Sequence, residues 1–192
     1  MMYKAYHRQI IGNVVAYIAD RFYKAKGYYI YQMVMYKILA FFDFQCVKQL
    51  GSPCTELDFR ARRMGPVPDE LYNNDEFVES FSEFSVINSE SYGQSRKQFK
   101  CDCEPDMDFI SPKEKRILDE IVDRFIAENI DAKKASDLSH KEIKAWRKAY
   151  ERTPNSQMLY ADEFDRNIFT EKEDELTLPE YNLRMYNEIA NA

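Results

Sequence analysis

The side chains that most often carry out catalysis are few in this sequence. His7 and His140 are its two histidines, and they fall in different predicted elements. A catalytic nucleophile needs a base within reach and a third group that orients the base. His140 is the best candidate base in the body of the chain, but no serine lies in a Gly-x-Ser-x-Gly motif and no pair of carboxylates stands out. We therefore predict no catalytic residues and no enzyme, and keep an enzyme centred on His140 as a third hypothesis.

The four cysteines do not form a metal-binding pattern. Cys101 and Cys103 are separated by one residue, which places both thiols on one face of a strand. Structural zinc sites usually repeat pairs of cysteines separated by two to four residues. Only 5 glycines are present, and no phosphate-binding glycine motif occurs. We expect free thiols, no metal and no cofactor.

Charge and hydrophobicity limit the class of protein further. The 192 residues carry a formal net charge of −6, and an acidic chain repels phosphate backbones, so nucleic acid is an unfavoured partner. No apolar run reaches the roughly 18 residues that a membrane span needs, and the N-terminus lacks an apolar signal-peptide region. With 45% hydrophobic residues the chain can form a real core. We predict a cytoplasmic protein without a membrane partner.

The sequence FRARRMGPVPDELY, Phe59 to Tyr72, contains the sharpest local change in chain character. Residues 56–64 alternate as in a short strand. Pro66 fixes its own φ and donates no backbone hydrogen bond, so we expect the strand ladder to end there. Pro68 suits the first turn of a helix, and the two acids after it favour the positive end of the helix dipole. Gly65-Pro66 is therefore predicted to be a hinge from strand to helix.

The three arginines of this segment suggest a protein contact. They are too few for a nucleic-acid site in an acidic protein, whereas arginine is enriched at binding hot spots. A charged edge strand that avoids aggregation is an equally weighted alternative. The predicted partner-binding residues are Arg60, Arg62, Arg63, Gly65, Pro66, Asp69 and Glu70.

Periodicity and capping signals predict the remaining elements. Apolar residues at helical spacing indicate helices over residues 9–25 and 31–49, and the second is apolar on most sides, as is typical of a central helix. Segments 84–89 and 97–103 are expected to pair as a hairpin. Start signals at Asn73, Ser111, Asp131, Ser139 and Thr177 predict helices to about residues 81, 128, 138, 152 and 189. The fold class is mainly α with a small β-sheet or hairpin (α+β), a compact helical domain.

Three segments, in this order, resemble a known family. MYKILAFFDF resembles the KLLYFA-like helix of the Panacea domain, also called the SocA-like or phage-associated antitoxin domain. FRARRMGPVPDELY resembles the family's aromatic strand that runs into Gly-Pro-Val, and ASDLSHKEIKAWRKAY resembles its LSxLTHxExxW element. The family usually has tryptophan where this chain has Arg62, and often tyrosine at Met64, which leaves open the surface chemistry of this strand.

The resemblance implies an antitoxin that neutralises a protein toxin, encoded nearby, by direct contact. It covers residues 9–169, so we predict a Panacea domain over 1–169 and a polar C-terminal helical extension over 170–192. It implies no catalytic residues. The alternative is a protease adaptor or phage-related regulatory binding protein without a toxin partner, with the C-terminal segment as a docking peptide. For the antitoxin, glutamate at Arg62 and Arg63 should weaken toxin binding while the fold survives.

Overall fold

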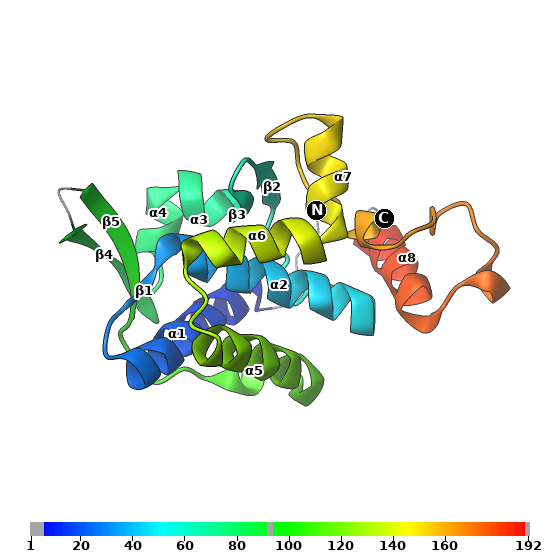
Figure 1. The fold of residues 1–192 in the computed structure, drawn as a ribbon. Helices are drawn as coiled ribbons and strands as arrows, with labels where there is room; N and C mark the ends of the chain where they lie inside the picture. The colour runs from blue at the N-terminus through cyan, green and yellow to red at the C-terminus, as the bar shows by residue number, and fades with distance from the viewer. Residues whose placement is uncertain (1–5, 92–93, 191–192) are drawn as a thin grey trace.

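The fold is built around α2, Gln32–Leu50, which is buried along most of its length. The computed structural model describes residues 6–91 and 94–190, and Figure 1 shows α2 lying between α1 and α5 on one side and α6 on the other. A helix that is apolar nearly all round has to be enclosed by other elements. The predicted central helix is therefore confirmed, and Gly51 ends it in a left-handed conformation with φ of 82°.

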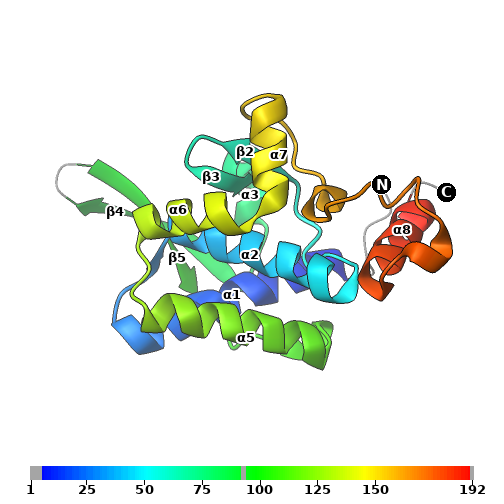
Figure 2. The same ribbon diagram turned by 45° about the vertical axis from the view of Figure 1, so that its right-hand side comes forward.

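The other helices cover α2 from several sides, and Figure 2 shows the same arrangement from a second direction. In chain order they are α1 His7–Lys26, α3 Asp69–Asn73, α4 Asp75–Glu79, α5 Pro112–Ala127, α6 Ala132–Glu142, α7 Lys144–Arg152 and α8 Leu178–Ala190. Short 3-10 turns lie at η1 Met107–Phe109, η2 Tyr160–Glu163 and η3 Glu173–Glu175.

Two small antiparallel sheets complete the structure. The first has the order β1-β5-β4, formed by β1 Ile30–Tyr31, β5 Gln94–Cys101 and β4 Phe84–Ser91. The second pairs β2 Phe59–Arg62 with β3 Gly65–Pro68. The predicted hairpin after residue 84 is thus confirmed, although its strands run further into the polar connection than expected. Tyr92 and Gly93, which come between the two strands in the sequence, lie outside the described residues. The α+β class predicted from the sequence is correct.

Two of the predicted helix starts are shifted. Asn74, not Asn73, caps α4, because its side-chain oxygen accepts a hydrogen bond from the Phe77 N–H at 2.9 Å. Ser139 does not begin a helix: α6 continues through it to Glu142, and the Ser139 hydroxyl donates to the carbonyl of Ser136 at 2.7 Å. A serine inside a helix can bond a carbonyl of the preceding turn in this way, which removes it from a capping role. The predicted capping box at Ser111 is confirmed.

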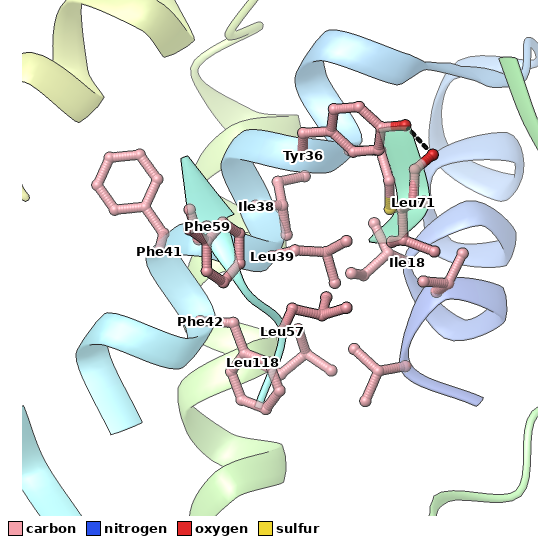
Figure 3. Packing of buried hydrophobic residues seen from close by; sticks show 14 of the residues in the cluster. Ile18, Tyr36, Ile38, Leu39, Phe41, Phe42, Leu57, Phe59, Leu71 and Leu118 are labelled. Carbon is pink, nitrogen blue, oxygen red and sulfur yellow. Dashed lines mark hydrogen bonds between the residues drawn. The ribbon is translucent and has the colours of Figure 1, made fainter. Parts of the chain in front are cut away.

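The core is one large apolar cluster around α2. Figure 3 shows Phe42 and Leu39 of α2 close to Leu118 of α5 and Leu57, which lies just before β2. The Tyr36 hydroxyl lies in this cluster and donates to the carbonyl of Leu71 at 2.6 Å. This bond satisfies a buried hydroxyl and joins α3 to the central helix.

Asp43 is a buried acid on α2 that fixes the loop leading into β2. Its carboxylate accepts hydrogen bonds from the backbone N–H groups of Cys54 and Thr55 at 3.1 and 2.7 Å, and from the Thr55 hydroxyl at 2.7 Å. The hydroxyl of Tyr160 also donates to it, at 3.0 Å. A buried carboxylate needs such donors to offset its lost hydration. The loop and η2 are thereby held on the same side of α2.

The C-terminal helix packs against the end of α2. Val47, Ile168 and Leu183 form a second apolar cluster there, and Leu183 is fully buried. Arg166 makes two hydrogen bonds to the carboxylate of Glu180, at 2.9 and 2.8 Å. The predicted final helix is confirmed, and its apolar residues, though sparse, are enough to hold it against the body. In the described ranges, no helix is long and apolar enough to cross a membrane.

Gly51 is expected to control the docking of α8. An added Cβ there would overlap the carbonyl oxygen of Pro179 and the Cβ of Asn182, both in α8, whereas a Cβ at Gly27 would have nothing within 4 Å. Both glycines have positive φ, so alanine at either costs about 1–2 kcal/mol of conformational strain. Only Gly51→Ala should also release α8, which would appear as faster proteolytic cleavage within residues 170–190 and a lower melting temperature.

Gly27→Ala is the matched control, since it carries the strain without the steric overlap. Equal cleavage of the C-terminal segment in the two variants would mean that Gly51 does not position α8.

Candidate partner-binding surface

The arginine segment folds into a tight hairpin. β2 and β3 pair antiparallel with Phe59 opposite Pro68 and Arg62 opposite Gly65, so residues 63–64 form the turn. Within β2, Phe59 is buried and Arg62 is half-buried, which confirms the predicted alternation over these residues. Arg63 and Met64 are exposed at the tip, with 50% of the Met64 surface accessible.

The predicted hinge at Gly65-Pro66 is wrong, because both residues belong to strand β3. Proline is tolerated there because its strand partner Ala61 directs its hydrogen bonds away from β3. The Ala61 N–H donates to Ser156 at 2.9 Å, and the Ala61 carbonyl accepts from the Asn155 N–H at 2.8 Å. In an antiparallel ladder, pairs of residues that exchange backbone hydrogen bonds alternate with pairs that do not. Ala61 and Pro66 form a pair of the second kind. The missing N–H of Pro66 therefore removes no bond between β2 and β3.

Lys37 of α2 holds β3 from the inside of the protein. Its side chain is fully buried, and its Nζ donates to the carbonyl oxygen of Pro66 at 2.8 Å. Burial disfavours the charged form and lowers the pKa of Lys37 from 10.5 to about 7. A buried amine needs a hydrogen-bond acceptor. Within the described residues, the carbonyl that accepts from Lys37 is that of Pro66 in β3.

Gly65 fits the narrow space above this lysine. Its φ is 95°, and a Cβ there would lie 2.8 Å from Lys37 Cε and overlap the Ser139 hydroxyl of α6. Only glycine combines that backbone conformation with so close an approach. Gly65 and Pro66 are buried, so within the predicted contact region their part is to shape the hairpin.

Aromatic side chains hold β2 at Arg62, next to the turn. The guanidinium carbon of Arg62 lies 4.1 Å from the ring centroid of Tyr72, and the carbonyl of Arg62 accepts a hydrogen bond from Trp146 Nε1 at 3.0 Å. The Trp146 ring stacks on His140, with ring centroids 3.8 Å apart, and on Tyr150, with centroids 4.9 Å apart. Cation–π contact and ring stacking both favour a fixed geometry. His140, the candidate base of the enzyme hypothesis, is thus packed on Trp146, and burial lowers its pKa.

The acidic helix after β3 is tied back to the strand before it. Arg60 lies 3.7 Å from the Asp69 carboxylate, and the Asp58 N–H donates to both carboxylate oxygens of Glu70, at 3.2 and 3.1 Å. Burial raises the pKa of Glu70 from 4.5 to about 7. The predicted acids are therefore close to the predicted arginines, and Asp69 and Glu70 serve the local structure.

The seven predicted residues lie in one hairpin and the helix after it, but they differ in exposure. Arg63 is the one exposed residue among them, while the others are half-buried or buried. Whether they bind a partner stays a prediction. Three neighbours were missed: Lys37, Met64 and Tyr72. A lysine inside the mostly apolar MVMYKILAFFDF was the available signal, because a buried amine has to meet an acceptor.

The pH dependence of stability is expected to identify the buried lysine. Between pH 7 and 10.5 the unfolded chain binds a proton at Lys37 that the folded chain has released, so stability rises with pH across this window. In Lys37→Met this contribution is absent. Urea unfolding should therefore show that the difference in free energy of unfolding between the two proteins changes from pH 7 to 10.5 and is constant below pH 7.

Lys113→Met, at an exposed position of α5, is the control and should follow the natural protein at every pH. Parallel profiles for the Lys37 variant and the natural protein would contradict a lowered pKa at this position.

Comparison with known proteins gives one match. A model of the antitoxin SocA-like, Panacea domain family matches residues 35–147, more than half of the chain. A search of the curated proteins and a search of the solved structures found no match. The matched stretch contains most of α2, including Lys37, and extends through the β2–β3 hairpin to Trp146. Lys37, the hairpin and Trp146 are the groups that hydrogen bonds join at the candidate surface. The chain therefore belongs to the antitoxin SocA-like, Panacea domain family.

Proposed function

We propose that this protein is an antitoxin that neutralises a protein toxin by direct contact and without catalysis. The observation that carries the proposal is the family match over residues 35–147, whose name supports an antitoxin-type role. The toxin is proposed to be encoded nearby.

The proposed contact surface is the tip of the β2–β3 hairpin with the ring beside it. Arg63 and Met64 are exposed there, and Tyr72 has 40% of its surface accessible. Arginine, methionine and tyrosine are all enriched at protein interfaces. The tip is exposed while its base is fixed, since Lys37 and Trp146 bond to the backbone on either side of the turn. A fixed surface loses little conformational freedom when a partner binds.

The segment after α7 adds to this rigidity. The N–H of Met158 donates to the carbonyl of Phe59 at 2.8 Å, next to the two bonds between Ala61 and residues 155–156. β2 is thus flanked by β3 on one side and by residues 155–158 on the other. β2 is therefore not an open edge strand, and the alternative hypothesis that its arginines protect such an edge is less favoured.

The adaptor alternative places a docking peptide at the C-terminus, where α8 packs on α2 and buries Leu183. Docking through this buried face would require α8 to move and would expose that side chain. The direct-contact proposal requires no such change.

Arg63→Glu is expected to weaken the toxin complex at least tenfold, a loss of about 1.4 kcal/mol, because it reverses a charge at the tip. The toxin would first be identified by inducing neighbouring open reading frames with and without this protein and following growth. Binding of the purified pair would then be measured by calorimetry, and rescue of growth by co-expression.

Arg116→Glu makes the same charge change at an exposed position of α5, away from the hairpin, and is expected to leave affinity unchanged. Arg63→Glu isolates the contact better than the double change with Arg62, whose guanidinium packs on Tyr72. Equal affinity of the two single variants would place the contact elsewhere. A neighbourhood with no toxic protein would overturn the proposed function itself.

A further inference from the structure

Strand β5 has an open edge along half of its length. On one side it pairs with β4 over residues 94–101, but on the other side β1 pairs only with Phe99 and Gln98. The chain turns into α2 directly after Tyr31, so no described strand continues beside residues 94–97. Figure 1 shows this end of the β4–β5 hairpin extending away from the helices. Along such an edge, alternate residues present backbone N–H and C=O groups that can pair with another chain.

A cleft of about 860 Å³ lies beside this open edge. Ser95, Arg96 and Lys97 of β5 form one wall, and the start of α6 forms part of another. Phe22, Ile30, Val34 and Ile130 are buried apolar residues that also line it. The cleft can therefore accept an apolar side chain next to a strand edge that can pair with a backbone.

The rim of the cleft is basic, in contrast to the acidic protein around it. Arg96, Lys97 and Lys133 are exposed, and Arg96 and Lys133 form no ion pair with a carboxylate within residues 6–91 and 94–190. Lys97 lies 3.3 Å from Asp75. Asp131 is the one acid among the lining residues, and its side chain is occupied as the cap of α6, where it accepts from the Lys134 N–H. The local charge thus favours an anionic occupant.

Tyrosine rings add to the rim. Tyr28 has 48% of its surface accessible and packs against Tyr31, with ring centroids 6.2 Å apart. The guanidinium of Arg96 lies 5.7 Å from the Tyr31 ring centroid. Tyrosine rings beside cations that form no ion pair are a composition typical of binding surfaces.

We propose that this cleft binds an extended, acidic segment of a partner protein, which adds a strand to the open edge of β5. The backbone of the segment pairs with residues 94–97, an apolar side chain enters the cleft, and acidic side chains meet Arg96 and Lys133. Strand addition takes its affinity from main-chain hydrogen bonds and its specificity from the side-chain sites beside the edge.

The open edge favours a polypeptide over a nucleic acid, because a nucleic acid cannot complete the backbone ladder. The cleft shares Tyr72 with the contact surface proposed above, but the open edge of β5 and the other lining residues lie outside the β2–β3 hairpin. The proposal requires no toxin, so it goes beyond the proposed function. All of its variants retain Arg63, and its failure would therefore leave the test of the proposed function unaffected.

The test uses the full chain and a fluorescein-labelled octapeptide of alternating glutamate and valine, followed by fluorescence anisotropy. Binding is expected for the natural protein and at least tenfold weaker binding for the double variant Arg96→Glu with Lys133→Glu. The matched control, Lys113→Glu with Arg116→Glu, makes the same change in net charge at exposed positions of α5 and should bind as the natural protein does.

Two modified probes test the strand addition itself. An added strand pairs through one edge of its backbone, and alternate residues direct their N–H groups to opposite edges. One probe therefore carries N-methyl groups on its glutamate amides and the other on its valine amides. We expect one of the two probes to bind and the other not to bind. Equal binding of the two, absence of binding by the unmodified peptide, or equal loss in the control variant would each overturn the proposal. So would displacement of the peptide by a single-stranded oligonucleotide of equal charge at equimolar concentration.

Discussion

The side-chain amine of Lys37 lies inside the protein, where the carbonyl oxygen of Pro66 accepts its hydrogen bond. Burying an amine is unfavourable unless an acceptor meets it, so β3 has one position on α2 that satisfies this group. Gly65 lets the backbone approach that closely, and the tip residues project from a base whose place is thereby set. The position of the proposed contact surface depends on this one bond more than on the arginines themselves.

Asp43 has a corresponding function on the same helix, six residues further along. Its carboxylate accepts hydrogen bonds from Thr55 and Tyr160. The chain entering β2 and the segment that follows α7 are therefore both attached to α2. A buried lysine and a buried aspartate on one helix thus fix the segments on both sides of the hairpin. Such polar contacts are directional, whereas the apolar core around them is not, and they select one arrangement among many compact ones.

Local signals in the sequence were enough to predict most helices, because periodicity and capping act within a few residues. The capping box at Ser111 and the left-handed stop at Gly51 are examples. The hairpin could not be predicted in the same way. Pro66 ends a ladder only if its missing N–H would face a partner strand. Here the strand partner Ala61 bonds instead to residues 155–156, almost a hundred positions away in the sequence. The arginine cluster was found by type, but the exposure of Arg63 and the burial of Gly65 follow from Lys37 and Ser139.

The pairing of β2 with residues 155–158 also bears on how the protein is made. During synthesis the chain emerges from its N-terminus, so β2 leaves the ribosome long before the segment that covers its outer edge. Until that segment appears, the hairpin has an unpaired edge of the kind that leads to aggregation. Closing such a long loop is entropically slow. The arginines of β2 would then protect the nascent chain during this interval, whatever they bind in the finished protein.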